Sequence, residues 1–102
     1  MIARHWRGWT EKGDAEAYER LLKEKVLPSL KTIAGFKGSY VLREDGPDDV
    51  EFVVINVFDS LDAVKQFAGP NYEVAVFEPE ARKLLNKIEP IAKHYEVRLS
   101  TI

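Results

Sequence analysis

The run from Val50 to Phe58 limits the fold of this chain more than any other stretch. It reads VEFVVINVF, and its β-branched and aromatic residues are typical of a central strand covered on both faces. Asp59-Ser60 follows, and either side chain can cap a helix over Leu61 to Ala68, which Gly69-Pro70 ends. We expect a second helical stretch at once, over Asn71 to Phe77.

A strand and an interrupted helix precede this run. Ile2 to Thr10 is predicted to be a strand whose odd and even residues face opposite sides, neither side being cleanly apolar. Lys12-Gly13 makes a turn, and Asp14 is the expected N-cap of a helix. Its apolar stripe comprises Tyr18, Leu21, Leu22, Val26, Leu30 and Ile33. Pro28 removes a helical hydrogen bond, so we expect a break near Leu27 and then a short second helix.

The remaining elements complete an alternating order. Phe36 to Glu44 is predicted to be a strand, with Phe36, Gly38, Tyr40 and Leu42 on one side. Turn residues at Asp45 to Asp49 join it to the central strand as an antiparallel hairpin. Pro79 suits the first turn of another helix, which Pro90 closes, and its expected buried side is Ala81, Leu84, Leu85 and Ile88. The last predicted strand runs from Lys93 to Thr101.

This order predicts an α+β fold of the ferredoxin-like βαββαβ type. Four antiparallel strands carry the helices on one face, and all 102 residues form one domain. A chain of this length buries only about 65% of its unfolded surface, so self-association is a natural supplement. We therefore expect a homodimer in which a second subunit covers the other face of the sheet.

Composition excludes several classes of function. Fifteen Lys and Arg residues against 17 Asp and Glu residues leave a net charge of −2, which is not the footprint of a nucleic-acid-binding protein. The absence of cysteine excludes thiolate chemistry and fits the reducing cytoplasm. No run approaches membrane-spanning length, and no signal peptide is recognisable. We expect a cytoplasmic protein without nucleic-acid or membrane partners.

Four segments together resemble the antibiotic biosynthesis monooxygenase family. They are Ile2 to Trp9, Lys12-Gly13 before a helix, Ile33 to Gly38 entering a strand, and Phe58 to Ala63 entering a later helix. The resemblance runs from about Met1 to Val97 and depends on the order and spacing of loose motifs. It implies a dimeric α+β barrel, formed by two ferredoxin-like sheets packed face to face.

The resemblance also implies two kinds of chemistry. Some members of the family oxidise aromatic polyketides without metal or flavin, because a deprotonated phenol or hydroquinone can itself reduce oxygen. Others degrade heme. Alignment on Lys12-Gly13 puts Trp6 where the heme branch has Asn, and alignment on Ser60 puts Phe67 at its Trp and Phe77 at its heme-ligating His. Phenylalanine cannot ligate iron, so heme degradation is disfavoured and no cofactor is expected.

Four aromatic residues are candidates for the wall of a substrate pocket. Trp6, Phe67 and Phe77 either bind a flat substrate or simply fill the core between sheet and helices, and the core role is the more ordinary one. Tyr72, next to Pro70, is either a capping or surface residue or a residue of the pocket. In the pocket its phenol would donate a hydrogen bond to a substrate oxygen or act as an acid.

The polar candidates come from the two ends of the chain. His94 is the better imidazole for a general base, although a lone histidine at a strand start is more often structural. His5 has the opposite parity to Trp6 and is expected at the dimer interface. Arg4 shares the face of Trp6 and needs a partner, for which we favour Glu96 or a helix carboxylate over a substrate oxyanion.

Two functions follow from these residues. The first is a cofactor-independent monooxygenase that acts on a small aromatic substrate, with His94 or Tyr72 handling protons and Arg4 steadying negative charge. The second is a dimeric ligand-binding or stress-response protein of the same fold without chemistry, because fold alone does not confer function.

Overall fold

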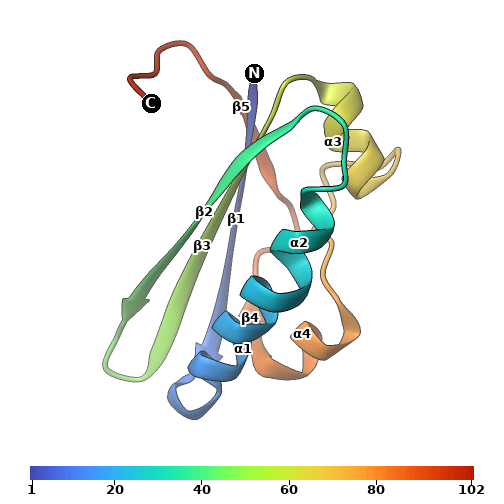
Figure 1. Ribbon diagram of the computed structural model, residues 1–102. Coiled ribbons are helices and arrows are strands. Elements are labelled where there is room, and N and C mark those ends of the chain that lie inside the picture. Colours follow the sequence, from blue (N-terminus) through green and yellow to red (C-terminus); the bar gives the residue numbers. More distant parts are fainter.

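An antiparallel sheet of five strands carries the helices on one of its faces in the computed structural model, which describes residues 1–102 (Figure 1). The strands are β1 (Ile2–Glu11), β2 (Phe36–Asp45), β3 (Asp49–Phe58), β4 (Leu85–Ile88) and β5 (Lys93–Glu96). Their order is β2-β3-β1, with both β4 and β5 on the free edge of β1. The predicted α+β, ferredoxin-like class is confirmed, with five strands in place of the expected four.

The helical elements are short and follow the predicted order. They are a 3₁₀ turn at Lys12–Asp14, α1 (Ala15–Leu21), a π-helical turn at Leu22–Val26, α2 (Leu27–Leu30), α3 (Leu61–Ala68) and α4 (Pro79–Leu84). The π-helical turn comes immediately before Leu27, where Pro28 cannot continue the α-helical hydrogen bonds. The predicted interruption is therefore confirmed.

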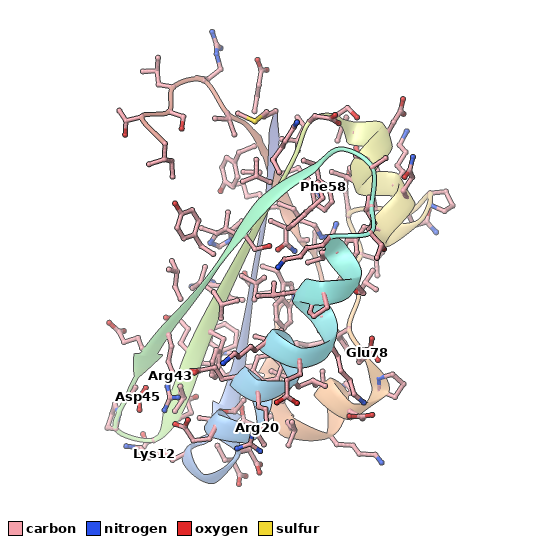
Figure 2. All side chains as sticks on the ribbon, in the orientation of Figure 1. Lys12, Arg20, Arg43, Asp45, Phe58 and Glu78 are labelled. Atoms are coloured by element: carbon pink, nitrogen blue, oxygen red, sulfur yellow. The ribbon has the colours of Figure 1, made fainter.

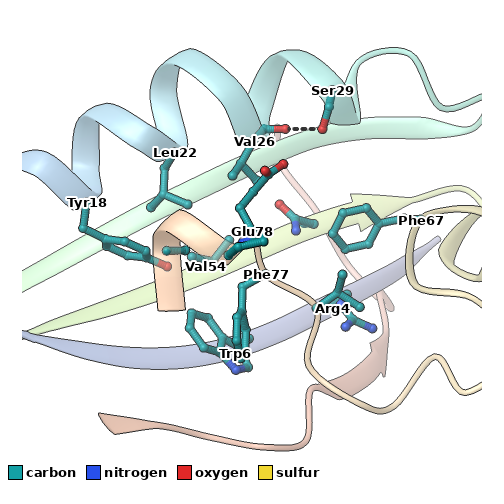
Figure 3. A pocket seen from close by; sticks show the side chains of 14 residues that line it. Arg4, Trp6, Tyr18, Leu22, Val26, Ser29, Val54, Phe67, Phe77 and Glu78 are labelled. Atoms are coloured by element: carbon teal, nitrogen blue, oxygen red, sulfur yellow. Dashed lines mark hydrogen bonds between the residues drawn. The ribbon is translucent and has the colours of Figure 1, made fainter. Parts of the chain in front are cut away.

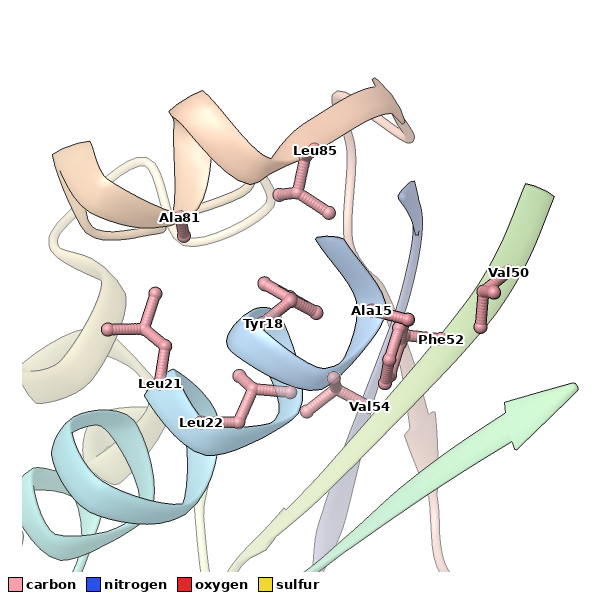
Figure 4. Packing of buried hydrophobic residues seen from close by; sticks show 9 residues of the cluster. All are labelled: Ala15, Tyr18, Leu21, Leu22, Val50, Phe52, Val54, Ala81 and Leu85. Atoms are coloured by element: carbon pink, nitrogen blue, oxygen red, sulfur yellow. The ribbon is translucent and has the colours of Figure 1, made fainter. Parts of the chain in front are cut away.

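Side chains of β3 alternate between the helix-covered face and the open face of the sheet. Val50, Phe52, Val54 and Phe58 are buried beneath the helices. Phe52 packs edge to face against Tyr18 of α1, with ring centroids 4.9 Å apart (Figure 4). Burial of one such side chain contributes about 1.5–3 kcal/mol to stability. The core therefore lies in one layer, between the sheet and the helices.

The other face of the sheet is open in the single chain. Tyr40 and Leu42 of β2 are 49% and 47% exposed, and Tyr95 of β5 is 47% exposed. Val53 and Ile55 of β3 lie between these strands on the same face and are half-buried. The expectation that β3 is covered on both faces therefore holds only on the helix side within one subunit.

Four local predictions were wrong. Asn71 to Phe77 is not a helix, because Ala75 N–H donates to Pro90 O and Ala92 N–H donates to Glu73 O, which ties this extended segment to the chain before β5. The helix that begins at Pro79 ends at Leu84 and not at Pro90, because the next four residues pair with β1 as strand β4. The other two wrong predictions concern which residues of β2 share a side and where the last strand ends.

A bulge between Phe36 and Gly38 turns Phe36 toward the core while Tyr40 and Leu42 point to the open face, so the four residues predicted to share a side do not. The last strand ends at Glu96, well before the predicted Thr101, because β1 begins at Ile2 and offers no further partner. At the first helix, Asp14 occupies the N-cap position, but its side chain makes no capping hydrogen bond. Figure 2 shows how side chains fill the space between the sheet and the helices.

Candidate functional site

A cavity of about 310 Å³ lies between the sheet and the helices. Nine of its fourteen lining residues are hydrophobic. Strands β1 and β3 form its floor, the first helical segment forms one wall, and the chain from α3 to α4 forms the other (Figure 3). Its volume is at the lower end of the range for small-molecule sites, about 300–1,000 Å³.

A row of polar side chains crosses the sheet at one end of this cavity. Ser39 of β2 lies opposite Asn56 of β3, Asn56 lies opposite Arg4 of β1, and Arg4 lies opposite His94 of β5. Ser39 Oγ donates a hydrogen bond to Asn56 Oδ1 at 2.6 Å, and Arg4 Nη1 lies 3.0 Å from His94 Nε2. Strand register alone thus brings together residues from four distant parts of the chain.

Arg4 is a buried cation without a carboxylate partner. Arg4 is only 4% exposed. Its guanidinium donates hydrogen bonds to the backbone oxygens of Tyr72 and Val74, the latter at 3.1 Å. It also lies 5.5 Å from the centroid of the Phe67 ring. Burial lowers the pKa of Arg4 to about 10, so it remains charged at neutral pH.

The partner that we favoured for Arg4 from the sequence was therefore wrong. Glu96 lies opposite Ile2 and approaches Arg98 at 3.9 Å, and no helix carboxylate forms an ion pair with Arg4. The guanidinium instead contacts carbonyl oxygens and lines the cavity. An anion that entered the cavity would meet a cation whose charge no carboxylate neutralises.

Asn56 is a site residue that the sequence interpretation missed. It is 5% exposed, lines the cavity beside Arg4, and its Nδ2 makes no hydrogen bond within the chain. The signal was an amide on the buried parity of an otherwise apolar strand, between Val54 and Phe58. The strand's hydrophobic composition hid this one polar position.

Tyr18 was also missed as a site residue. It belongs to the apolar stripe of α1, is 2% exposed, and lines the cavity. Its hydroxyl makes no hydrogen bond within the chain and is turned toward the interior of the cavity (Figure 3). Burial raises the pKa of Tyr18 above its usual value, so the phenol stays protonated. The signal available in the sequence was a tyrosine in the apolar stripe of the helix, because the hydroxyl of a buried tyrosine normally has a hydrogen-bond partner.

The three predicted aromatic residues all reach the cavity wall. Trp6 and Phe77 lie with ring centroids 6.1 Å apart and also pack on the core, and Phe67 lies at the Arg4 end. The Trp6 indole is held in place because its Nε1–H donates to Glu89 O at 2.6 Å. A role for these rings in binding substrate stays a prediction.

The two predicted proton-handling residues lie behind Arg4. His94 and Tyr72 contact each other edge to face, with ring centroids 5.0 Å apart, and neither lines the cavity. Burial, and then the charge of Arg4, lower the pKa of His94. Its Nε2 faces an N–H donor of Arg4 and so accepts a hydrogen bond in the neutral ring. Their catalytic roles stay predictions.

Two other features of the chain bear on its chemistry. No group of three or more His, Asp or Glu side chains is arranged to hold a metal ion. None of the helices combines the length and apolar character needed to cross a membrane.

Comparison with known proteins places this geometry in a family. The family model described as antibiotic biosynthesis monooxygenase matches residues 1–72. No curated protein matches the chain at a significant level. A crystal structure from Bacillus cereus, described as a candidate antibiotic biosynthesis monooxygenase, is 17% identical with a TM-score of 0.69, and the match covers 100% of this chain and 95% of that one.

SnoaB, a cofactor-independent oxygenase from Streptomyces nogalater, is 20% identical with a TM-score of 0.68, and the match covers 98% of this chain and 96% of that one. At these identities the two structures establish a shared fold. The family model carries the assignment, because it spans residues 1–72 of 102 and includes Arg4, Tyr18, Asn56 and Phe67. The chain belongs to the antibiotic biosynthesis monooxygenase family.

Proposed function

We propose that this protein, a single domain over residues 1–102, is a cofactor-independent monooxygenase that oxidises a small aromatic phenol in the cavity between sheet and helices. The observation that carries the proposal is Arg4, a buried guanidinium that faces an aromatic-lined cavity and forms no ion pair with a carboxylate, Glu78 being the one acidic residue in the lining. A phenolate has the negative oxygen and the flat apolar body that this surface fits. Membership of the family supports the reaction class.

Stabilising the phenolate is the main task of the protein in this reaction. The deprotonated ring is electron-rich and supplies the four electrons that reduce O2. One oxygen atom replaces a hydrogen on a ring carbon and becomes the second carbonyl oxygen of a quinone, and the other leaves as water with that ring hydrogen and the phenolic proton. Arg4 and the free Nδ2–H of Asn56 would hold the phenolate oxygen, and the low-polarity walls would strengthen that interaction. Trp6, Phe67 and Phe77 would orient the ring and exclude water.

We propose His94 and Tyr72 as the groups that handle protons. The imidazole of His94 is neutral and accepts a hydrogen bond from Arg4. An oxyanion bound to the same guanidinium would therefore be separated from the imidazole only by the Arg4 side chain. For direct transfer, the substrate must replace the contact between Arg4 and His94. This requirement makes the pair testable by His94→Ala and Tyr72→Phe.

Oxygen uptake with anthrone and 1-naphthol tests the proposal. Arg4→Met should lower kcat/KM by about 10- to 100-fold, since a hydrogen bond to a charged group contributes about 1.5–3 kcal/mol. Arg20→Met, at an exposed position of α1 outside the cavity, is the matched control and should leave the rate unchanged. No oxygen uptake by the native protein, or equal rates in the two variants, would refute the proposal.

A ligand-binding protein without turnover is the second candidate. Its support is that neither His94 nor Tyr72 lines the cavity. Calorimetry separates the two functions: tight binding of 1-naphthol without oxygen uptake favours the second. The Arg4→Met variant should weaken binding in either case.

We also propose that the open face of the sheet is covered by a second copy of the chain. Tyr40, Leu42 and Tyr95 form an exposed apolar surface there. The charge of Arg7 on this face is already paired with Glu89 at 2.9 Å, so covering it leaves no isolated ion. Light scattering should give about twice the 11.7 kDa of one chain, and Leu42→Glu should shift the mass toward the monomer. A native protein that stays monomeric at micromolar concentration would refute the dimer.

A further inference from the structure

The cavity has a polar group at each end, and the two ends differ in charge. Arg4 and Asn56 supply cationic and amide donors at one end. At the other end, Tyr18 packs over Phe52, which is four residues before Asn56 on the same face of β3, about 13 Å along the strand. Between them Trp6, Leu22, Val54 and Phe77 form an apolar part of the wall, and Ser29 and Glu78 also line the cavity (Figure 3).

The Tyr18 hydroxyl is a hydrogen-bond donor without an acceptor in the protein, and it faces the cavity. Tyr18 is only 2% exposed, and no atom of the protein accepts a hydrogen bond from its hydroxyl. The hydroxyl oxygen is open to the cavity and is not sealed within the core, so an oxygen atom of a ligand in the cavity can reach it. Because burial keeps the phenol protonated, it can donate to a neutral oxygen at neutral pH.

We propose that Tyr18 is a specificity-determining residue, whose hydroxyl donates a hydrogen bond to a second, neutral oxygen on the ligand, at the opposite edge of the ring system from the oxyanion held by Arg4. This inference rests on the proposed function, since it takes the phenolate at Arg4 as given. The preferred ligand is then a fused aromatic phenol with a hydroxyl or carbonyl group across the ring system. A phenol without that group would bind through Arg4 alone.

Tyr18→Phe isolates this hydrogen bond. The substitution removes one oxygen atom that has no protein partner and keeps the ring that packs on Phe52, so the fold should be unaffected. Tyr40→Phe is the matched control, because it makes the same chemical change on the open face of the sheet, at a residue that does not line the cavity. Equal thermal stability of the two variants and the native protein checks that any effect on binding is local.

Calorimetric titration with two naphthols provides the test. 1-Naphthol carries one oxygen, and 1,5-dihydroxynaphthalene carries a second at the far edge. For the native protein and Tyr40→Phe, the dihydroxy compound should bind more tightly. Tyr18→Phe should weaken binding of 1,5-dihydroxynaphthalene by about 3- to 10-fold, the range of a neutral hydrogen bond, and should leave binding of 1-naphthol within twofold.

The outcomes separate this inference from the proposed function. If both naphthols bind the native protein and Arg4→Met weakens both, but Tyr18→Phe affects them equally, then the role of Tyr18 is refuted and the phenol site stands. If neither naphthol binds the native protein, the proposed function and this inference both fail. A selective loss for the dihydroxy compound alone, with native thermal stability, supports the role of Tyr18.

Discussion

Gly8 is the position at which one added methyl group should disturb both stability and the cavity. A Cβ built on Gly8 would overlap Cη2 of the Trp6 indole and would lie 3.0 Å from Cδ2 of Leu85. The indole cannot simply turn away, because its Nε1–H donates to Glu89 O at 2.6 Å. Gly8→Ala must therefore displace the Trp6 ring that lines the cavity.

The expected cost follows from two contributions. Forcing a methyl group into a packed site costs about 1–3 kcal/mol. If the indole shifts far enough to lose its hydrogen bond, about 0.5–1.5 kcal/mol more is lost. A total of about 1.5–4.5 kcal/mol should lower the Tm by roughly 6 °C or more in a domain of this size.

Gly13→Ala is the matched control for this substitution. Nothing lies within 4 Å of the position that its Cβ would occupy, and its φ is not in the left-handed region. The control should be neutral or should raise stability by about 0.4–1 kcal/mol through the unfolded state. Urea unfolding of both variants measures the difference, and titration with 1-naphthol should show weaker binding only for Gly8→Ala. If the free energies of unfolding of the two variants differ by less than about 0.5 kcal/mol, which is below the cost of adding a methyl group to a packed site, the packing argument is refuted.

Two further predictions concern protonation and helix capping. The pKa of His94 is below its ordinary 6.5, so between pH 6.5 and the native value the unfolded chain binds a proton that the native protein does not. Stability should therefore fall as the pH falls through this window, by at most about 1.4 kcal/mol per pH unit, and the slope should diminish in His94→Asn; thermal melts between pH 7.5 and 4.5 measure it. Ser60 Oγ accepts a hydrogen bond from Ala63 N–H at 3.2 Å. Ser60→Ala should therefore lower the free energy of unfolding in urea by about 1 kcal/mol. Asp14→Ala removes no capping hydrogen bond and should lower it by less. Equal losses at the two positions would contradict the capping argument.

The sequence predicts the regular elements well wherever local chemistry decides them. The β-branched run of β3, the serine cap of α3 and the proline-linked break before α2 each depend on neighbouring residues, and all three are confirmed. Asn71 to Phe77 failed because its backbone hydrogen bonds go to Pro90 and Ala92, which are distant in the sequence. Helical spacing alone could not reveal that competition.

The site was predictable in part for the same reason. Arg4, Trp6, Phe67 and Phe77 were named as candidates from face parity or family resemblance, and the structure places all four on the cavity. Asn56 was missed because its polar role depends on which residues of neighbouring strands lie opposite it. Pairing register is a tertiary property, and no window of the sequence contains it.

The polar row formed by Ser39, Asn56, Arg4 and His94 has a consequence for folding kinetics. Its members come from four different strands, so the anion-binding end of the cavity exists only after β1, β2, β3 and β5 have paired in register. A partly folded chain that lacks any one of these strands cannot bind the ligand there. The ligand should therefore slow unfolding while leaving the refolding rate almost unchanged, because the transition state that precedes complete pairing gains nothing from it.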